Sequence, residues 1–414
     1  MTAAPSEHAE RRSLPPGWRT VRLGEVGAIG AGITLGKLFL HEETRLVPYL
    51  RVANVKDGYL DLADVNQLAL PEWEIQKCLL RQGDLLLTEG GDPDKLGRGT
   101  VWEGQLPECV HQNHIFRVRF NPTQIEPKFV SFELQSPYGK AYFLKHAKQT
   151  TGIATINQRV LANFPLMLPP LAEQCAIVAR IERDMAEVAR LRAAAERQRE
   201  AIEGLIVSGM REVFHDASAH DWRRRRLGDV CITVEGQVDP RLPEFCDLPH
   251  INGEVIERAT GRLLNYRTAQ EDKLISGKYL FPAGSVIYSK LRPYLRKVVL
   301  VDFRGLCSAD AYPLIVTSEN LTSEWLKWAL LSEDFTSYAI EESLRSRMPK
   351  LNREQLMAWK LPLPDKATQV RLSSYLEHQV AVMTTMLRGW QTQNTALTLL
   401  PAALLREVFE GEAS

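Results

Sequence analysis

The most informative part of this 414-residue sequence begins with Trp18-Arg19 and Leu23-Gly24-Glu25-Val26, because the same pattern returns at Trp222-Arg223 and Leu227-Gly228-Asp229-Val230. The matched features keep their order along the chain, while the segments between them differ in length. A solenoid of short repeats would recur about every 20 to 50 residues. A long pattern that occurs only twice therefore predicts a tandem duplication of one large unit.

Further matched features support the duplication. Both copies end on the same tetrapeptide, Arg211-Glu212-Val213-Phe214 and Arg406-Glu407-Val408-Phe409. The other matched pairs are Gly83 with Gly284, Ile156-Asn157 with Leu351-Asn352, Leu168-Pro169 with Leu363-Pro364, and Gln174 with Gln369. The spacing between partners shrinks along the chain, so the second copy has lost residues in its variable middle.

Each copy changes character at a proline-rich joint. Before the joint of the first copy, short apolar runs alternate with turn residues, which predicts strands at Val47–Val52, Asp84–Thr88 and His114–Phe120. The stretch Lys128–Lys148 is predicted to be helical. The joint itself, Pro165–Pro170, is predicted to be extended, because proline fixes its own backbone and disfavours helix in the residue before it.

After each joint the sequence predicts one long helix, which is Leu171–Phe214 in the first copy. Apolar residues recur there at alternating three- and four-residue steps, and such a stripe packs well against one partner helix and poorly against a broad core. We therefore expect the two long helices to pair with each other; the alternative is that each packs on its own globular copy. The predicted seam contains Val178, Ile181, Met185, Val188, Ile202, Leu376, Val380, Met383, Leu387, Trp390 and Leu397.

Four residues interrupt this seam. Arg192 and Arg199 lie in the first stripe, and Asn394 and Pro401 lie in the second. A polar Asn in a helix seam fits a role in fixing register. Pro401 is expected to kink or restart the second helix near its end, because proline lacks the N–H of a helix interior.

Composition narrows the class of protein. Lys plus Arg (51) equals Asp plus Glu (51), so a surface for nucleic acid has to be local and not a property of the whole chain. No apolar run approaches the ~20 residues of a membrane helix, and the beginning of the sequence lacks the apolar core of a secretory signal. Six cysteines without a Cys-x-x-Cys pair indicate free thiols, and we expect a cytoplasmic location.

Four motifs of the first copy belong together. They are the head Leu14-Pro15-x-Gly17-Trp18-x-x-x-x-Leu23-Gly24-Glu25-Val26, Gly83-Asp84-Leu85-Leu86, Thr151–Asn157, and the joint Leu168-Pro169-Pro170-Leu171-Ala172-Glu173-Gln174. With them the chain resembles a specificity subunit of a type I restriction–modification enzyme over nearly its whole length. The joint is the most specific of these motifs. The second copy departs from the pattern at Leu363–Gln369 and at Ser346-Arg347-Met348-Pro349.

The resemblance implies a fold class and a division of the chain. The expected fold is α+β, with two tandem mixed α/β target-recognition domains separated by two long helices that pair as an antiparallel coiled coil. The first domain would span 1–170 and the first spacer helix 171–216. The second domain would span 217–365 and the second spacer helix 366–414.

The resemblance also implies a non-catalytic reader of double-stranded DNA. Each domain would bind one half of an asymmetric, bipartite target, and the helices would dock two copies of a methyltransferase subunit. A nuclease/translocase subunit would join the assembly. This chain would bind no cofactor itself, whereas S-adenosylmethionine, ATP and Mg would act on the partner subunits.

Two other classes of function remain. One is a bipartite DNA-binding regulator or scaffold without a modification partner, which co-purification with an adenine methyltransferase would separate from the first class. The other is a stand-alone enzyme, which methylation by the isolated chain would support.

Candidate DNA contacts in the first copy lie in a Gly-rich loop, Thr88–Gly99, and in polar segments near it. Lysine and arginine side chains suit phosphates and guanine edges, and carboxylates can accept from cytosine. A flexible, solvated loop is the alternative interpretation. The candidates are Thr88, Glu89, Lys95, Arg98, Asn113, His114, Lys148, Gln149 and Thr151.

The second copy carries a more basic segment, Ser289–Lys297, at the place that matches the Gly-rich loop. It combines four cations with one aromatic residue, a composition that suits phosphate binding together with base-edge contact. The segment Arg345–Lys350 matches Thr151-Gly152 and is also basic, whereas Arg223–Arg226 is expected to be solvated or to face a partner. The candidates are Ser289, Lys290, Arg292, Tyr294, Arg296, Lys297, Arg347 and Lys350.

Three tempting motifs fail on spacing or residue type. Gly30–Leu38 has five residues between its outer glycines and a Leu after the Lys, so it is no P-loop. Asn163–Leu166 lacks the second Pro and the aromatic of an amino-methyltransferase motif. Cys109–His114 could offer metal ligands, but His111 and His114 would point to opposite faces of a strand. We therefore predict no catalytic residues and no metal site.

Overall fold

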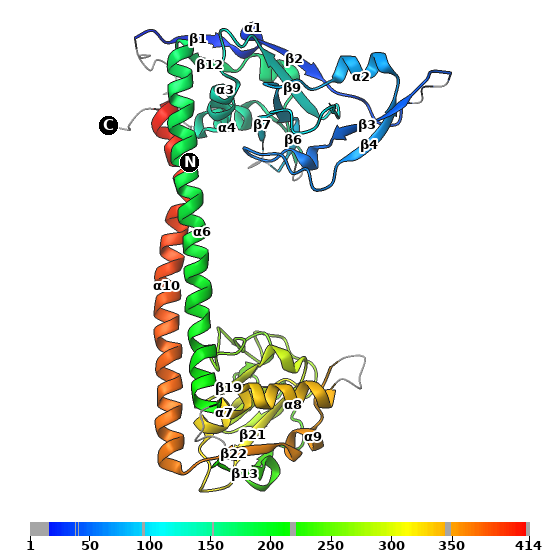
Figure 1. Cartoon of the computed structure of the whole chain (residues 1–414). Coiled ribbons are helices and arrows are strands. Elements are labelled where there is room, and N and C mark those ends of the chain that lie inside the picture. The colour runs from blue at the N-terminus through cyan, green and yellow to red at the C-terminus, as the bar shows by residue number, and fades with distance from the viewer. Residues whose placement is uncertain are drawn as a thin grey trace. The chain divides into compact units, whose positions relative to one another are not determined.

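The computed structural model describes residues 16–37, 39, 41–92, 96–150, 153–215, 221–343 and 349–410. It divides into two compact units (Figure 1). Unit 1 contains Met1–Ala194 and Gln393–Ser414, and unit 2 contains Ala195–Thr392. Each of the two long helices therefore contributes one part to each unit.

Unit 1 is built around a four-stranded antiparallel sheet in the order β2-β9-β5-β7, next to a three-stranded sheet in the order β4-β3-β8. In the second sheet β3 is antiparallel to β4 and parallel to β8. The strands are β2 (Gly27–Ala31), β3 (Arg45–Leu50), β4 (Asn66–Leu70), β5 (Leu85–Thr88), β7 (Gly99–Val101), β8 (Val110–His111) and β9 (Ile115–Phe120).

Two smaller pairings complete the sheets of unit 1. The first strand of the unit pairs with the joint, and a short three-stranded sheet in the order β10-β11-β6 closes one edge. These strands are β1 (Arg19–Arg22), β6 (Gly90–Gly91), β10 (Lys148–Thr150), β11 (Ile153–Thr155) and β12 (Pro165–Leu168). The helices of the globular part are α1 (Leu23–Val26), α2 (Glu72–Cys78), α3 (Pro127–Gln135), α4 (Pro137–His146) and α5 (Gln158–Ala162), and the residues Val52–Asn54 form the 3₁₀ turn η1.

Unit 2 repeats the order of the main sheet and the pairing of the first strand with the joint, and its mixed sheet has one more strand than that of unit 1. Its main sheet has the order β14-β21-β18-β19, and its mixed sheet has the order β16-β15-β20-β17, again with one parallel pair, β15 with β20. The strands are β13 (Arg223–Arg226), β14 (Cys231–Thr233), β15 (Pro249–Ile251), β16 (Arg267–Thr268), β17 (Tyr279–Phe281), β18 (Val286–Ser289), β19 (Val298–Leu300), β20 (Gly305–Cys307), β21 (Ala311–Val316) and β22 (Lys360–Leu363). The helices are α7 (Ser323–Leu331), α8 (Glu333–Ser343) and α9 (Arg353–Ala358), with 3₁₀ turns η4 (Leu227–Asp229) and η5 (Pro293–Leu295).

The two long helices are α6 (Leu171–His215) and α10 (Lys366–Glu410), each of 45 residues. In unit 1, Arg180 lies beside Glu407 and Arg192 contacts Leu397. In unit 2, Ala195 contacts Trp390 and Glu212 contacts Tyr375. Within each unit the residue numbers run in opposite directions, so the pairing is antiparallel. The predicted fold class, including the antiparallel helix pair, is confirmed.

The predicted seam residues lie where the two helices pack. In unit 1, Val178, Ile181, Val188 and Leu397 are buried and Met185 is half-buried. In unit 2 the seam is continuous with the globular core: Ile202, Leu376, Val380 and Met383 are buried, and Leu387 and Trp390 pack against the same cluster. The stripes therefore serve both interpretations, because each pairs with the other helix and also packs on a globular core.

The repeated tetrapeptides anchor the ends of the helices. Phe409, near the end of α10, packs edge-on against Phe129 of α3 in unit 1, with ring centroids 5.4 Å apart. Phe214, near the end of α6, stacks on Trp325 of α7 in unit 2 at 5.1 Å. Each copy of the tetrapeptide thus inserts its phenylalanine into the unit that contains the far end of its helix.

The two matched glutamines hold the starts of the long helices. Gln174 is fully buried; its side-chain amide donates to the carbonyls of Gln124 and Pro169, and its oxygen accepts from the N–H of Glu126. Gln369 repeats the arrangement with Asn320, Pro364 and Thr322. Each amide satisfies three backbone groups that would otherwise be buried without partners, so this part of the joint motif is structural.

Two other matched features are also structural. Gly83 and Gly284 have φ angles of 89° and 82° in the turns that precede β5 and β18, a conformation that favours glycine. Asn157 and Asn352 cap α5 and α9 by accepting from the backbone N–H three residues on. The sequence similarity between the copies therefore reflects shared turns, caps and buried amides.

Two local predictions hold only in part. The helix expected over Lys128–Lys148 is divided into α3 and α4, because Pro137 has no N–H to continue the first helix and Ser136 caps the second. α10 also does not restart at Pro401, but continues through it to Glu410. Arg192 of α6 supplies a donor at the point where Pro401 cannot, as described below.

Candidate nucleic-acid interface

In unit 1 the structure brings together two polar segments that are far apart in sequence. β6, which follows the central strand β5, pairs antiparallel with β11, so that Gly90 and Gly91 face Thr155 and Ala154. The backbone of Glu89 also accepts from the N–H of Ile156. The described residues Glu89–Gly91 of the predicted loop and Ala154–Ile156 after the second segment therefore lie side by side.

Gly90 makes this pairing possible. A Cβ atom at this position would lie 2.6 Å from the Thr155 side chain and 2.9 Å from the Ala154 carbonyl oxygen. Any larger residue would push the two segments apart. The glycine content of the loop is therefore a packing requirement at this point, and does not indicate a freely mobile loop.

The predicted contacts of unit 1 differ in how exposed they are. Lys148 and Gln149 on β10 are exposed, Asn113 and Arg98 are half-buried, and Thr88 is buried with its hydroxyl directed at the Arg98 carbonyl at 3.3 Å. His114 and Glu89 form a side-chain pair with Nδ1 and Oε2 2.6 Å apart. The Glu89 carboxylate is therefore already hydrogen-bonded to His114, and this contact competes with any hydrogen bond from a DNA base. Lys95 and Thr151 lie outside the described residues.

Unit 2 brings its two basic segments together at the equivalent place. Leu291 forms a bridge with Lys350, and the N–H of Arg292 donates to the Pro349 carbonyl at 3.0 Å. The N–H of Leu351 donates to the Lys290 carbonyl at 3.1 Å. The matching of the two segments between copies, inferred from sequence order, is thus reproduced as spatial proximity in both units. Arg347 lies outside the described residues.

Two of the predicted cations of unit 2 support the loop from inside. Lys290 is buried, its ammonium donates to the Ala309 carbonyl, and it lies 5.2 Å from the centroid of the Tyr312 ring. Burial, together with the nearby Lys350, lowers the pKa of Lys290. Lys297 is half-buried and donates to the Gly253 carbonyl. Ser289 is buried as well. In the unliganded chain these side chains hold the loop, and whether they also reach DNA stays a prediction.

Arg292 and Arg296 adopt an unusual backbone conformation. Their φ angles are 51° and 47°, and they flank η5 on either side. Left-handed conformations cost non-glycine residues on the order of 1 kcal/mol and cluster at functional sites. The strained turn leaves Arg292 and Tyr294 exposed, beside the exposed Lys350. The Arg292 side chain is exposed at the start of this turn.

The arginine run that opens unit 2 lies on β13, where all four side chains are exposed. Arg224 donates to Asp334 at 2.9 Å, and the strand pairs with β22 at the joint. The run thus lies on the strand that pairs with the joint. Its role toward a partner stays a prediction.

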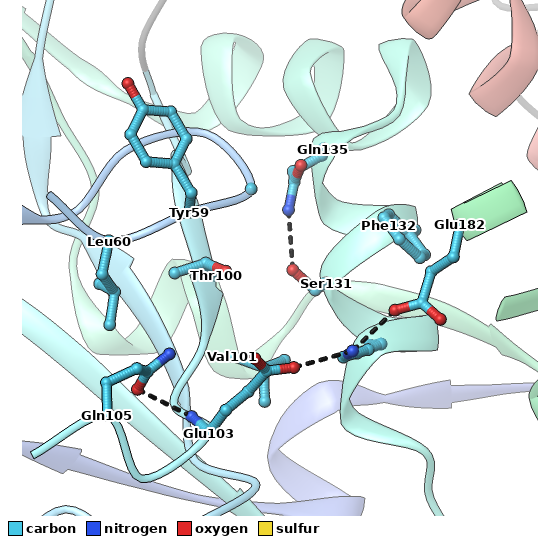
Figure 2. Close-up of a pocket in the computed structure, with 12 residues that line it drawn as sticks. Tyr59, Leu60, Thr100, Val101, Glu103, Gln105, Ser131, Phe132, Gln135 and Glu182 are labelled. Carbon is cyan, nitrogen blue, oxygen red and sulfur yellow. Dashed lines mark hydrogen bonds and ion pairs between the residues drawn. The ribbon is translucent and has the colours of Figure 1, made fainter. Parts of the chain in front are cut away.

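Sequence reasoning missed a cavity of about 300 Å³ in unit 1 (Figure 2). Its wall includes Tyr59 and Phe132, and the Lys128 ammonium lies between the carboxylates of Glu103 and Glu182 at 2.8 and 2.7 Å. These two hydrogen bonds raise the pKa of Lys128. A larger hollow of about 860 Å³ shares this wall and extends along the helices to Arg192 and Pro401. No sequence signal pointed to this cavity, because the residues of its walls come from four separate segments of the chain.

Each unit also buries one histidine, and no sequence pattern indicated this shared feature. His111 is fully buried, and burial lowers its pKa to about 4. His250 is also buried, but the Asp272 carboxylate lies 2.7 Å from its Nδ1 and partly opposes the lowering of its pKa by burial. Among the described residues no group of three or more His, Cys, Asp or Glu side chains could hold a metal ion. Nor does any helix in the described ranges have the length and apolarity needed to cross a bilayer.

The chain belongs to a defined family of DNA-specificity proteins. The family model for the type I restriction modification DNA specificity domain matches twice, over residues 15–189 and 219–389. The two matches coincide with the two copies recognised from the repeat. The chain is therefore a member of the type I restriction–modification specificity family with two such domains.

Curated relatives carry corresponding names. The chain is 31% identical over 196 residues to the EcoDI specificity subunit of a type I restriction enzyme from Escherichia coli, which is 47% of this chain and 42% of that protein. It is 26% identical over 178 residues to the EcoKI specificity subunit from Escherichia coli strain K12, covering 42% and 38%. The match thus spans less than half of the length of either relative.

Solved structures share the fold over almost the whole chain. A chain solved in work on complex assembly and conformational transition of the type I R-M system matches with a TM-score of 0.76 and 20% identity, covering 96% of this chain and 99% of that one. The HsdS subunit from Thermoanaerobacter tengcongensis matches with a TM-score of 0.60 and 21% identity, covering 97% and 99%. At these identities the likeness establishes the fold.

Proposed function

We propose that this chain is the DNA sequence-recognition subunit of a type I restriction–modification enzyme. Each unit binds one half of an asymmetric, bipartite target in double-stranded DNA, and the chain has no catalytic site of its own. Its long helices dock two copies of a methyltransferase subunit, and a nuclease/translocase subunit joins the assembly. S-adenosylmethionine, ATP and Mg act on those partners.

One observation carries the proposal. The two units share their buried framework, yet differ in the loops that follow the equivalent strands β5 and β18. Unit 1 presents a Gly-rich segment that pairs with β11, and unit 2 presents exposed Arg292 and Tyr294 on a strained turn. Two similar folds with chemically different polar surfaces suit the reading of two different half-sites.

The helices suit the task of spacing the half-sites. A 45-residue helix is about 68 Å long at 1.5 Å per residue, and one turn of B-DNA is about 34 Å. A helix of this length spans about two turns of the duplex. The helix pair offers exposed outer faces to a methyltransferase, since its apolar stripes are used within the pair.

The proposal is tested by mapping methylated adenines across the genome with and without this gene. We expect a single bipartite motif with a fixed number of unspecified base pairs between its halves, and we expect it to vanish when the gene is deleted. An unchanged methylation map would contradict the proposal. Co-purification without an adenine methyltransferase, combined with specific DNA binding, would favour a regulator or scaffold instead.

A second experiment tests the DNA surface directly. The full chain with its partner subunits is titrated with a duplex that contains the mapped motif, at several salt concentrations. We expect log K to fall steeply with log salt, because phosphate contacts release counterions. A motif-independent affinity with no salt slope would exclude the loops as phosphate-binding surfaces.

A further inference from the structure

The helix pair in unit 1 contains an unusual polar contact. Pro401 lies inside α10 and has no N–H, so the carbonyl of Leu397, four residues earlier, loses its usual helical donor. The Arg192 guanidinium on α6 donates from Nη2 to this carbonyl at 3.1 Å, and to the Thr398 carbonyl at 3.3 Å. One side chain thus caps the gap that the proline opens.

The equivalent positions in unit 2 are apolar. The repeated tetrapeptides Arg211–Phe214 and Arg406–Phe409 align Arg192 with Leu387 and Pro401 with Ile206. Ile206 is buried, and Leu387 packs against the same hydrophobic cluster. Unit 1 therefore has a proline and an arginine where unit 2 has two apolar residues, and the arginine satisfies the carbonyl that the proline leaves without a donor.

We propose that Arg192 and Pro401 fix the axial register of the helix pair in unit 1, and that Arg192 is thereby a positioning residue for the distance between the two half-sites. The inference rests on the proposed bipartite recognition. Apolar contacts are non-directional and tolerate a slide of one helix along the other, whereas a directional bond to one carbonyl does not. Among the described residues, Pro401 is the only proline inside either long helix beyond its first turn, so the freed carbonyl marks one position on α10.

The location of the contact argues against a role in stability alone. Arg192 is exposed, and both Arg192 and Pro401 line the hollow of about 860 Å³ beside the helices. Water could satisfy the freed carbonyls there at little cost. A slide by one helical turn would be about 5.4 Å, which is between one and two base-pair steps of DNA. Loss of the cap should therefore broaden the range of spacer lengths that the chain accepts.

The experiment uses the full chain in its methyltransferase complex, with duplexes that carry the mapped motif at its natural spacer length and with one or two base pairs added or removed. The measured quantity is the ratio of the affinity for the natural spacer to the affinity for an altered spacer. We expect Arg192→Leu to lower this ratio roughly tenfold, because one charge-assisted hydrogen bond changes an equilibrium constant by about this factor. Arg190→Leu is the control, because Arg190 forms an ion pair with Glu187 of its own helix at 2.7 Å.

A double variant separates the mechanism from general damage. Pro401→Ile restores the N–H and, with Arg192→Leu, recreates the apolar pair of unit 2, so Arg192→Leu is expected to have no further effect in the Pro401→Ile background. Equal effects of Arg192→Leu in both backgrounds would overturn the inference, as would an unchanged spacer preference in Arg192→Leu. A wild-type complex that is indifferent to spacer length would overturn the proposed bipartite function as well. Arg192→Lys, which keeps one donor, should recover part of the preference.

Discussion

Units 1 and 2 differ most where they are most exposed and agree most where polar groups are buried. Gln174 and Gln369 hold the same three kinds of backbone group, and Asn157 and Asn352 cap equivalent helices. The surfaces after β5 and β18, in contrast, share neither composition nor backbone conformation. A buried hydrogen-bonding side chain has few acceptable replacements, whereas an exposed loop can change residue by residue. The two units therefore diverge in the exposed segments after β5 and β18 and keep the buried framework in common.

The most sensitive test of this shared framework is the buried amide pair. Gln174→Leu and Gln369→Leu each leave three backbone groups buried without partners, and we expect each to destabilise its own unit by about 4 kcal/mol. Urea unfolding of the full chain measures the effect. Gln198→Leu, an exposed position on α6, is the control. A large loss from one variant and none from the other would break the equivalence of the two units.

The buried histidines predict a difference between the units in acid. Neutral His111 contributes stability that is complete above its unfolded pKa of 6.5 and is lost as the pH falls toward about 4, because only the unfolded state takes up the proton in this range. We expect unit 1 to lose about 2 kcal/mol between pH 7 and pH 5. His250 should contribute less, because Asp272 opposes the effect of burial.

This acid effect is checked by urea unfolding at pH 7 and at pH 5. The free energy of unfolding of the chain is compared with that of its His111→Leu variant. The variant should lose most of the pH dependence. If the variant kept the full dependence, His111 would not be its source.

The recognition loops predict a smaller and separable pair of effects. Arg292→Ala should weaken DNA binding about tenfold and flatten the salt slope by about one phosphate contact, without a change in melting temperature. Lys290→Ala should weaken DNA binding and also lower the melting temperature, because the Lys290 ammonium supports the loop through the Ala309 carbonyl. Binding isotherms and thermal melts are measured on the same samples. Arg241→Ala is the control, since Arg241 pairs locally with Asp239; unaltered affinity in Arg292→Ala would remove Arg292 from the interface.

The smallest effect is expected in the helix seam of unit 2. Trp390 donates from its indole N–H to the Ala195 carbonyl at 2.6 Å, and Trp390→Phe removes this bond while it keeps most of the apolar area. We expect a loss of about 1 kcal/mol in unfolding free energy. Trp328→Phe serves as the comparison, because Trp328 is a buried tryptophan of unit 2 whose indole N–H has no hydrogen-bond partner among the described residues. Identical losses in the two variants would show that the seam bond contributes nothing of its own.

The architecture could be predicted from the sequence because duplication and periodicity are properties of residue order. The tandem copies, the extended joints and both long helices follow from such patterns. The side-chain roles could not be predicted in the same way. Lys290 looks like a surface cation in the sequence, but the Ala309 carbonyl that binds it lies 19 residues further along the chain. The split between α3 and α4 at Pro137 could have been predicted from the proline alone.

The candidate site was predictable as a region and not as a set of contacts. The two segments that meet in each unit were matched between copies from their order alone, and the strained turn at Arg292 and Arg296 has no sequence signature, since arginine rarely adopts a positive φ. In the sequence, Arg192 interrupts the apolar seam. Its contact with Leu397 requires knowledge of which residues face each other across two helices, which depends on register.

The packing of Phe409 against Phe129 has a consequence for biosynthesis. Residues Gln393–Glu410 belong to unit 1, yet they are translated after the whole of unit 2. At about 5–20 residues per second, the ribosome needs roughly 10 to 40 seconds to travel from α6 to the end of α10. Throughout that interval the core around Phe129 lacks Leu405 and Phe409, so the first unit to be synthesised is the last to be completed.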